Sequence, residues 1–165
     1  MSKPILERAT GFATYRHRHQ FRRDGVTPYV EHPKAVMAIL RDEFAVRDPE
    51  VLAAGLLHDT IEDTATDYDA IAEEFGSRVA SLVAALTKDK RLPESRRDRE
   101  YFAQLSRAPL AAKICKVADT LHNLRDSDTA LRPKARRKGL KLLRIFKGVP
   151  ALAGPLGLLR EEMRR

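Results

Sequence analysis

The chain has 165 residues, of which 43% are hydrophobic, 31 are Lys or Arg and 23 are Asp or Glu, and its formal net charge is +8. This length suits a single domain with a hydrophobic core and argues against intrinsic disorder. No apolar run approaches the ~20 residues that a membrane-spanning helix requires. The N-terminus shows no secretory signal pattern, and one cysteine leaves no internal disulfide framework. We therefore expect a cytoplasmic protein.

The excess positive charge lies in one segment near the C-terminus. Residues 132–148 hold eight Lys or Arg and no acidic residue, so the rest of the chain carries equal numbers of both signs. A basic face of this kind could attract a phosphate-rich ligand or a nucleic acid. It could equally be an ordinary solvated helix face, and the sequence leaves its role open.

Helical spacing of apolar residues predicts helices along the whole first third of the chain. The first is expected over residues 5–21, and it ends before the turn signals Asp24-Gly25 and Pro28. A second begins near residue 29. The third begins at Asp48, which can cap a helix whose first residue is Pro49.

The remainder of the chain continues this helical pattern. A short helix capped by Thr66 or Asp67 ends at Gly76, and further helices are predicted over residues 77–86, 96–105 and 109–124. A basic amphipathic helix follows Pro133 and runs to about residue 147. The prolines and glycines of residues 150–157 then leave only a short closing segment. No strand alternation, glycine-rich phosphate loop or repeat is present, so we predict an all-α bundle of about eight or nine helices without a substantial sheet.

The most informative stretch is residues 55–64, which read GLLHDTIEDT after an apolar approach. If this stretch is one helix, His58 and Glu62 lie one turn apart, and so do Asp59 and Asp63. Four titratable groups beside an apolar segment require compensation, because an unpaired buried charge is costly. A divalent metal is the simplest explanation, and a solvated acidic helix end is the alternative.

Other chemistry-bearing residues occur at separate helices and loops. His32 begins the second helix, where a structural role is the alternative to metal binding, and Asp119 and Asn123 share one face of the later helix at spacing i, i+4. His122 falls about a third of a turn away and is expected to point less inward. The loop residues Arg22 and Arg23 suit a phosphate or a nucleobase, since guanidinium offers a hydrogen-bonding fork and a stacking plane; two ordinary surface arginines are the alternative.

Two histidines and two carboxylates from three helices make a plausible metal-binding set: His32, His58, Asp59 and Asp119. Mixed imidazole and carboxylate ligands suit Mn²⁺, Fe²⁺ or Zn²⁺. Such an ion would lower the pKa of a bound water and polarise a phosphoryl oxygen. Glu62 and Asp63, one turn later, could orient that water or move its proton. The chemistry this suggests is hydrolysis of a phosphoester or a pyrophosphate.

Longer motifs carry a specific resemblance. Residues 20–33 read QFRRDGVTPYVEHP, residues 54–64 read AGLLHDTIEDT and residues 116–125 read KVADTLHNLR, with Leu86-Thr87-Lys88 between the last two. This order resembles the hydrolase domain of RelA/SpoT proteins, within the HD phosphohydrolase superfamily, which cleaves the 3′-pyrophosphate of ppGpp and pppGpp. The match runs over about residues 6–126 and is looser beyond.

At this length we expect none of the synthetase or regulatory domains of the longer RelA/SpoT proteins. The chain is therefore similar to the stand-alone small alarmone hydrolases that also occur in animals. We expect one HD-type domain over residues 1–165, with a motif-bearing core at about 6–126 and a basic helical extension at about 132–163.

The resemblance also implies a role for individual residues. Four would be the Mn²⁺ ligands (His32, His58, Asp59 and Asp119), two would be the catalytic acidic pair (Glu62 and Asp63), and five would contact substrate (Arg22, Arg23, Lys88, Asn123 and Asp126). Two positions depart from the pattern. Thr120 replaces a residue that is usually basic, and Asp126 stands where the long enzymes usually have Thr. Both departures leave the fine substrate preference open.

The function implied is a metal-dependent guanosine-3′,5′-bis(diphosphate) 3′-pyrophosphohydrolase that uses Mn²⁺, with Fe²⁺ or Zn²⁺ possible. One alternative is a related phosphohydrolase that acts on the 2′-phosphate of NADPH or on another nucleotide. Another is a non-catalytic nucleotide- or RNA-binding domain that uses residues 132–147. We expect a guanine nucleotide as partner, no membrane and no specific nucleic acid, while oligomeric state and native metal stay open.

Overall fold

A computed structural model describes residues 3–165, so Met1 and Ser2, which begin the predicted domain, lie outside the described range. Within that range the chain is helical and forms no sheet, and a single bridge pairs Phe21 with Pro28. The all-α prediction is confirmed. The elements in chain order are α1 (Ile5–Arg16), α2 (Glu31–Ala38), a π-helical turn η1 (Ile39–Glu43), α3 (Pro49–Leu57), α4 (Thr60–Asp63), α5 (Tyr68–Phe75), α6 (Ser77–Leu86), α7 (Glu94–Arg107), α8 (Leu110–Arg125), α9 (Arg132–Ile145), the 3₁₀ turn η2 (Pro150–Leu152) and α10 (Ala153–Glu162).

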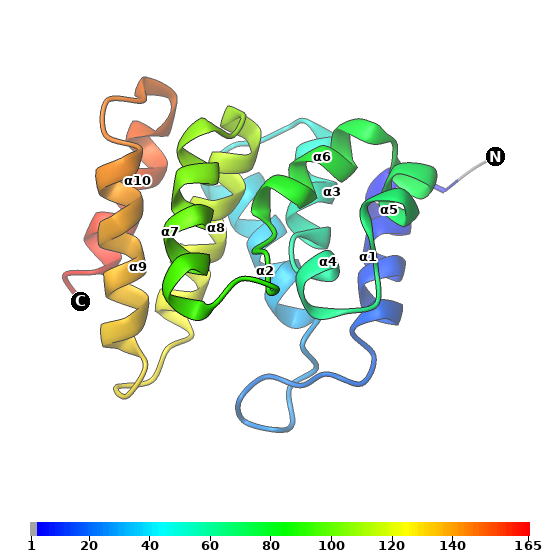
Figure 1. Ribbon diagram of the computed structural model, residues 1–165, viewed down its shortest axis with the longest axis horizontal. Coiled ribbons are helices and arrows are strands. Elements are labelled where there is room, and N and C mark those ends of the chain that lie inside the picture. Colours follow the sequence, from blue (N-terminus) through cyan, green and yellow to red (C-terminus); the bar gives the residue numbers. More distant parts are fainter. Residues whose placement is uncertain (1–2) are drawn as a thin grey trace.

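Helix α3 forms the centre of the molecule. Every residue from Val51 to Leu57 is buried, and the helix packs against α1, α2, α6 and α8. A helix that is apolar all round is expected at the centre of a bundle, because it has no face for water. Figure 1 shows α9 and α10 together at one end of the molecule and α1 with α5 at the other. No helix among residues 3–165 is long and apolar enough to cross a membrane.

Local capping explains where several helices begin and end. Asp48 accepts a hydrogen bond from the backbone N–H of Glu50 at 3.0 Å, with Pro49 as the first residue of α3. Asp67 accepts one from the N–H of Ala70 at 2.9 Å and so caps α5. Gly76 joins α5 to α6 at φ 90°, a conformation that favours glycine. These three predicted boundaries are confirmed.

Three predicted elements differ in the structure. Helix α1 ends at Arg16 instead of near residue 21, and the third predicted helix divides into α3 and α4. The closing segment, predicted to be short and to follow a break at residues 150–157, is the ten-residue helix α10, which begins at Ala153. Pro155 is tolerated there because it lies in the first turn, where backbone N–H groups have no helical acceptor.

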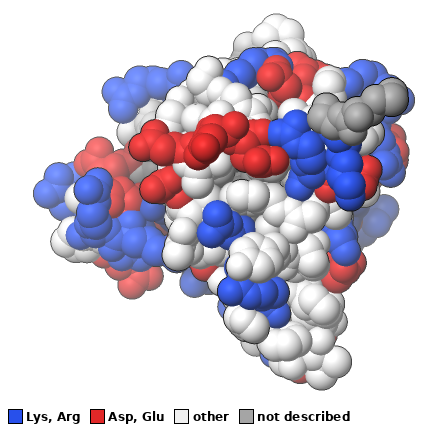
Figure 2. Space-filling view, turned by 90° about the vertical axis from the view of Figure 1, so that its right-hand side faces the viewer, with Lys and Arg blue, Asp and Glu red and all other residues white. Residues whose placement is uncertain are grey.

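The charge on the face that carries α1 and α5 is mixed. Figure 2 shows acidic side chains gathered in a band on that side of the molecule, with basic side chains around it. The basic helix α9 lies at the other end in Figure 1. The basic segment that the sequence shows at residues 132–148 therefore lies away from the face that carries α1 and α5.

Candidate functional site: a metal centre beside two cavities

The helix break after α3 shapes the site. His58 follows the last residue of α3, and Asp59 precedes α4 with φ −99° and ψ −3°. The hydroxyl of Thr60 donates to the carbonyl of Leu57 at 2.7 Å, so a side chain bonds to a carbonyl at the end of α3. The prediction that residues 55–64 form one helix was therefore wrong. The turn places His58 and Asp59 next to His32 of α2 and Asp119 of α8.

Backbone and side-chain contacts orient both predicted histidine ligands. His58 Nδ1 lies 2.8 Å from the carbonyl of Gly55. Because a carbonyl only accepts, Nδ1 carries the proton and Nε2 keeps its lone pair. His32 Nδ1 lies 2.8 Å from Nδ1 of His122, which leaves His32 Nε2 facing the carboxylates. His122 thus points inward, contrary to the sequence prediction, because α2 packs against α8 at this level.

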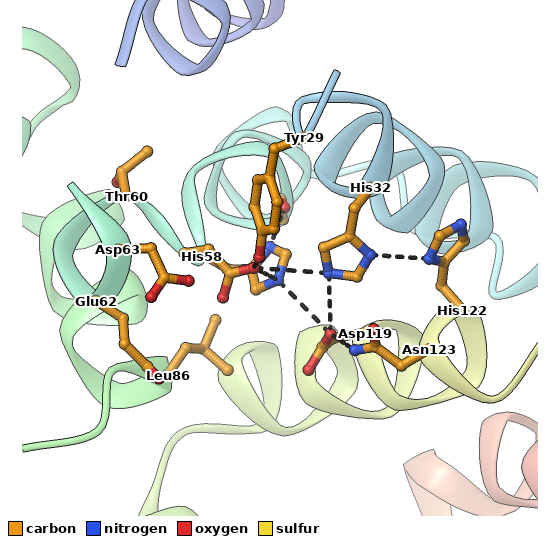
Figure 3. A network of polar contacts seen from close by, with 12 residues as sticks. Tyr29, His32, His58, Thr60, Glu62, Asp63, Leu86, Asp119, His122 and Asn123 are labelled. Carbon is orange, nitrogen blue, oxygen red and sulfur yellow. Dashed lines mark hydrogen bonds and ion pairs between the residues drawn. The ribbon is translucent and has the colours of Figure 1, made fainter. Parts of the chain in front are cut away.

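The two free imidazole nitrogens meet two carboxylates. His58 Nε2 lies 3.0 Å from Asp59 Oδ2 and 3.7 Å from Asp119 Oδ1. His32 Nε2 lies 3.2 Å from Asp119 Oδ1 and 3.6 Å from Asp59 Oδ2. The structure therefore brings all four predicted ligands together from α2, the α3–α4 turn and α8, as Figure 3 shows for the labelled His32, His58 and Asp119.

The cluster fits a divalent metal on two grounds. His32, His58 and Asp59 each offer one ligand atom within 4.8 Å of the other two. His58 Nε2 is fully buried, and none of its contacts with the described residues has hydrogen-bond geometry. A buried polar atom without a hydrogen bond is unfavourable in a folded protein. A cation that accepts its lone pair removes that cost, and imidazole with carboxylate is a donor set for Mn²⁺, Fe²⁺ and Zn²⁺.

The electrostatics of the cluster also favour a positive partner. Burial works against the ionised form of Asp119, but the ammonium of Lys116 and the two imidazoles lower its pKa well below the ordinary value. Burial likewise opposes ionisation of Asp59, and the charge of His58 outweighs it and lowers the pKa of Asp59. Burial opposes a proton on His58, yet the carboxylates of Asp59 and Asp119 raise its pKa. The same field that attracts a proton attracts a metal cation.

A second layer of side chains holds the carboxylates in place. The hydroxyl of Tyr29 donates to Asp59 Oδ2 at 2.6 Å, and burial followed by the Asp59 charge raises the pKa of this phenol, so it stays a donor. Lys116 Nζ donates to Asp119 Oδ2 at 2.6 Å, and Asn123 Nδ2 donates to Asp119 Oδ1 at 2.5 Å. Sequence reasoning assigned no role to Tyr29 or Lys116. The i, i+3 spacing of Lys116 and Asp119 was the signal that could have identified one of them.

The predicted acidic pair lies beside the histidine–carboxylate cluster. Figure 3 shows the carboxylates of Glu62 and Asp63 next to the cluster. Glu62 Oε2 accepts a hydrogen bond from the backbone N–H of Lys88 at 3.0 Å, and Asp63 Oδ1 pairs with Lys90 Nζ at 2.6 Å. The loop after α6 therefore fixes the direction of both side chains.

Two adjoining cavities extend from this centre. The first, of about 170 Å³, is lined by candidate ligands, the acidic pair and three lysines, Lys88, Lys116 and Lys138. The second, of about 180 Å³, is lined by Arg22, Arg23, Asn123, Asp126 and Lys134, among others. Asn123, Ala135 and Lys138 line both cavities.

All five predicted substrate contacts line one or both of these cavities. Two of them are bonded to one another, since Arg22 Nη2 lies 2.5 Å from Asp126 Oδ2. The contribution of α9 was missed, because a run of basic residues does not reveal which of them faces inward.

The sequence and the fold are both similar to those of known hydrolases. A family model described as HD domain matches residues 9–159. Proteins of mouse and human, each described as guanosine-3′,5′-bis(diphosphate) 3′-pyrophosphohydrolase MESH1, are 46% identical to this chain over 123 residues, which is 74% of this chain and 68% of theirs. A solved structure, described as a metazoan orthologue of SpoT that hydrolyses ppGpp, superposes with a TM-score of 0.88 at 31% identity and covers 99% of this chain and 96% of its own.

Proposed function

This chain belongs to the HD domain family, and from that membership we propose that it hydrolyses the 3′-pyrophosphate of ppGpp and pppGpp, releasing GDP or GTP. The observation that carries this function is one cavity lined by His32, Asp59 and Asp119 together with the acidic pair and three lysines. A hydrolase for a diphosphate ester needs a water-activating group and positive charge for the phosphates. This cavity supplies both.

In this proposal His32, His58, Asp59 and Asp119 hold the metal, and the metal is Mn²⁺. The cation, when bound, lowers the pKa of water and stabilises negative charge on a phosphoryl oxygen. The hydrogen bonds of Tyr29, Lys116 and Asn123 hold the carboxylates in place. We include the whole of residues 1–165 in one hydrolase domain, because α9 lines both cavities.

The acidic pair acts on the attacking water. Glu62 and Asp63 line the same cavity as the candidate ligands and can orient a water toward the phosphorus atom bonded to the 3′-oxygen. One carboxylate takes the proton of that water as the new oxygen–phosphorus bond forms. The bond between phosphorus and the 3′-oxygen then breaks, and that oxygen is protonated to give the free hydroxyl and pyrophosphate.

The second cavity suits the nucleoside portion of the substrate. Arg22 and Arg23 offer planar guanidinium groups that can stack on a base or bond a phosphate. Asn123 and Asp126 provide polar groups beside them. Because the two cavities share Asn123 and Lys138, a nucleotide lying in the second can reach the first with its 3′-phosphate.

Product analysis tests this function. Metal-stripped protein is incubated with ppGpp with and without Mn²⁺, alongside Asp59→Ala, which removes an anionic ligand. We expect GDP and pyrophosphate only from the original protein with Mn²⁺, and no stoichiometric Mn²⁺ on the variant. Parallel reactions with Fe²⁺ and Zn²⁺ identify the preferred metal. Turnover of NADPH or a deoxynucleotide without turnover of ppGpp would refute the proposal, and full Mn²⁺ retention by Asp59→Ala would refute the ligand assignment.

A further inference from the structure

Lys138 occupies a distinctive position on α9. It lines the cavity that contains the candidate metal ligands and also the cavity that contains Arg22 and Arg23. Lys134, one helical turn earlier, lines only the second of these. Lys138 is therefore the cationic residue at the junction of the two cavities.

The other two lysines of the metal-side cavity already have acidic partners. Lys116 Nζ lies 2.6 Å from Asp119 Oδ2, and Lys88 Nζ lies 3.2 Å from Asp98 Oδ1. Lys138 has no ion pair with a carboxylate among residues 3–165. Its ammonium is the one member of this group that is available to an incoming anion.

The electrostatic surroundings of Lys138 also favour the binding of an anion. Burial, and after it the positive charges of Lys88 and Lys116, lower the pKa of Lys138. A half-buried ammonium beside two other ammonium groups is destabilised until negative charge approaches it. A phosphate group compensates it, with charge-assisted hydrogen bonds from the ammonium to its oxygens.

The cavity contents indicate which phosphate this is. Under the function proposed above, the phosphate that is attacked lies beside the candidate ligands and Glu62. A diphosphate ester carries a second phosphate, which must lie in the same cavity but farther from the scissile bond. We propose that Lys138 binds this distal phosphate and thereby makes the site selective for diphosphate esters over phosphomonoesters.

A binding experiment tests the proposal without turnover. The probes are methylenediphosphonate, methylphosphonate and GDP, titrated by calorimetry at a fixed concentration of free Mn²⁺. For Lys138→Met we expect the Kd of methylenediphosphonate to rise about tenfold or more, because one charge-assisted hydrogen bond is lost. The Kd values of methylphosphonate and GDP should stay unchanged. Lys138→Arg keeps the charge and should keep most of the affinity.

Lys141→Met is the matched control. Lys141 lies on the same helix, but its ammonium sits 4.9 Å from the ring centre of Phe102 and lines neither of the two cavities. The Lys141→Met variant should bind all three probes with the same Kd values as the original protein. An equal loss of affinity for all probes in Lys138→Met, or a loss confined to GDP, would overturn the proposal.

A kinetic comparison then connects binding to selectivity. For Lys138→Met, kcat/KM should fall about tenfold or more on ppGpp and should not change on the corresponding 3′-phosphomonoester, guanosine 5′-diphosphate 3′-phosphate. An equal fall on both substrates would contradict the inference. If the original protein does not turn over ppGpp, the proposed function fails, whereas the phosphonate titration still decides the role of Lys138.

Discussion

At the scale of single residues, each of the two histidines in the site is oriented by a contact at its Nδ1. The Gly55 carbonyl sets the tautomer of His58, and His122 contacts the Nδ1 of His32. Burial and the neighbouring His32 lower the pKa of His122 to about 4, so it is neutral and can accept a hydrogen bond from His32. Partners of this kind commonly fix the direction and basicity of metal-binding imidazoles.

Glu62→Gln separates catalysis from metal binding. The amide still fills the space of the carboxylate but cannot accept a proton from water. We expect Mn²⁺ stoichiometry to be unchanged and kcat on ppGpp to fall by about 10²–10⁴-fold, the range typical of a general base. Metal content and steady-state rates are measured on the same preparation.

Glu73→Gln provides the control, because it neutralises an exposed carboxylate on α5. Its rate and metal content should match those of the original protein. Simultaneous loss of metal and rate in Glu62→Gln would identify Glu62 as a ligand instead of a proton acceptor.

At the scale of elements, the short helix α4 is held from outside. It has four residues, and Asp59 makes no side-chain capping bond at its start. Gln20 Nε2 donates to the carbonyl of Asp63 at 2.6 Å, and His17 Nδ1 lies 2.7 Å from Gln20 Oε1. The carbonyls at the end of a helix lack internal donors, so the amide of Gln20 supplies one. The loop between α1 and α2 therefore braces the segment that carries the acidic pair.

Gln20→Glu removes this donor while keeping the size of the side chain. We expect α4 to be destabilised by about 1 kcal/mol, with roughly fivefold faster exchange of the amides of Asp63 and Thr64, which bond to the carbonyls of Asp59 and Thr60. The kcat on ppGpp should fall, and Mn²⁺ binding should not. Hydrogen exchange followed by NMR measures the first effect, with the amides of α10 as an internal reference. Unchanged exchange at both amides would show that Gln20 does not brace α4.

At the scale of the whole molecule, α9 and α10 complete the site by packing on α8. Arg132 Nη2 donates to the carbonyl of Glu162 at 2.8 Å, and Arg125 Nε lies 3.5 Å from Glu162 Oε2. These contacts connect α8, α9 and α10 around a buried carboxylate. This packing fixes the position of α9 relative to α8, and therefore the position at which Lys138 lines the cavity.

Gly139→Val tests this packing. A Cβ at Gly139 would lie 2.7 Å from Met163 Sδ and 3.8 Å from Leu159 Cδ1, so a branched side chain overfills the contact between α9 and α10. We expect the free energy of unfolding in urea to fall by about 1–3 kcal/mol. Gly157→Val on α10 is the matched control, because a Cβ there meets no atom within 4 Å. Equal stability of the two variants would contradict a close contact at Gly139.

Much of the fold could be predicted from local signals. Asp48 with Pro49, Asp67 and Gly76 mark helix boundaries because capping and backbone conformation involve only a few neighbouring residues. Helical periodicity identified the all-α class for the same reason. The sequence also predicted that His58, Asp59 and Glu62 belong to a functional cluster, because histidine and carboxylate groups at the end of an apolar run require a compensating charge. That these residues bind a metal and perform catalysis stays a prediction.

Only the tertiary structure decided how distant parts of the chain meet. It placed Asp119 of α8 against His32 of α2 and turned His122 inward, because the faces that pack together depend on side chains far apart in the sequence. It also divided the helix at His58 and brought Lys138 of α9 over the cavity. The sequence by itself determined the all-α class, several helix boundaries and the kinds of ligand atoms. Their convergence at one point required the packing of α2, α3, α8 and α9, which no local pattern encodes.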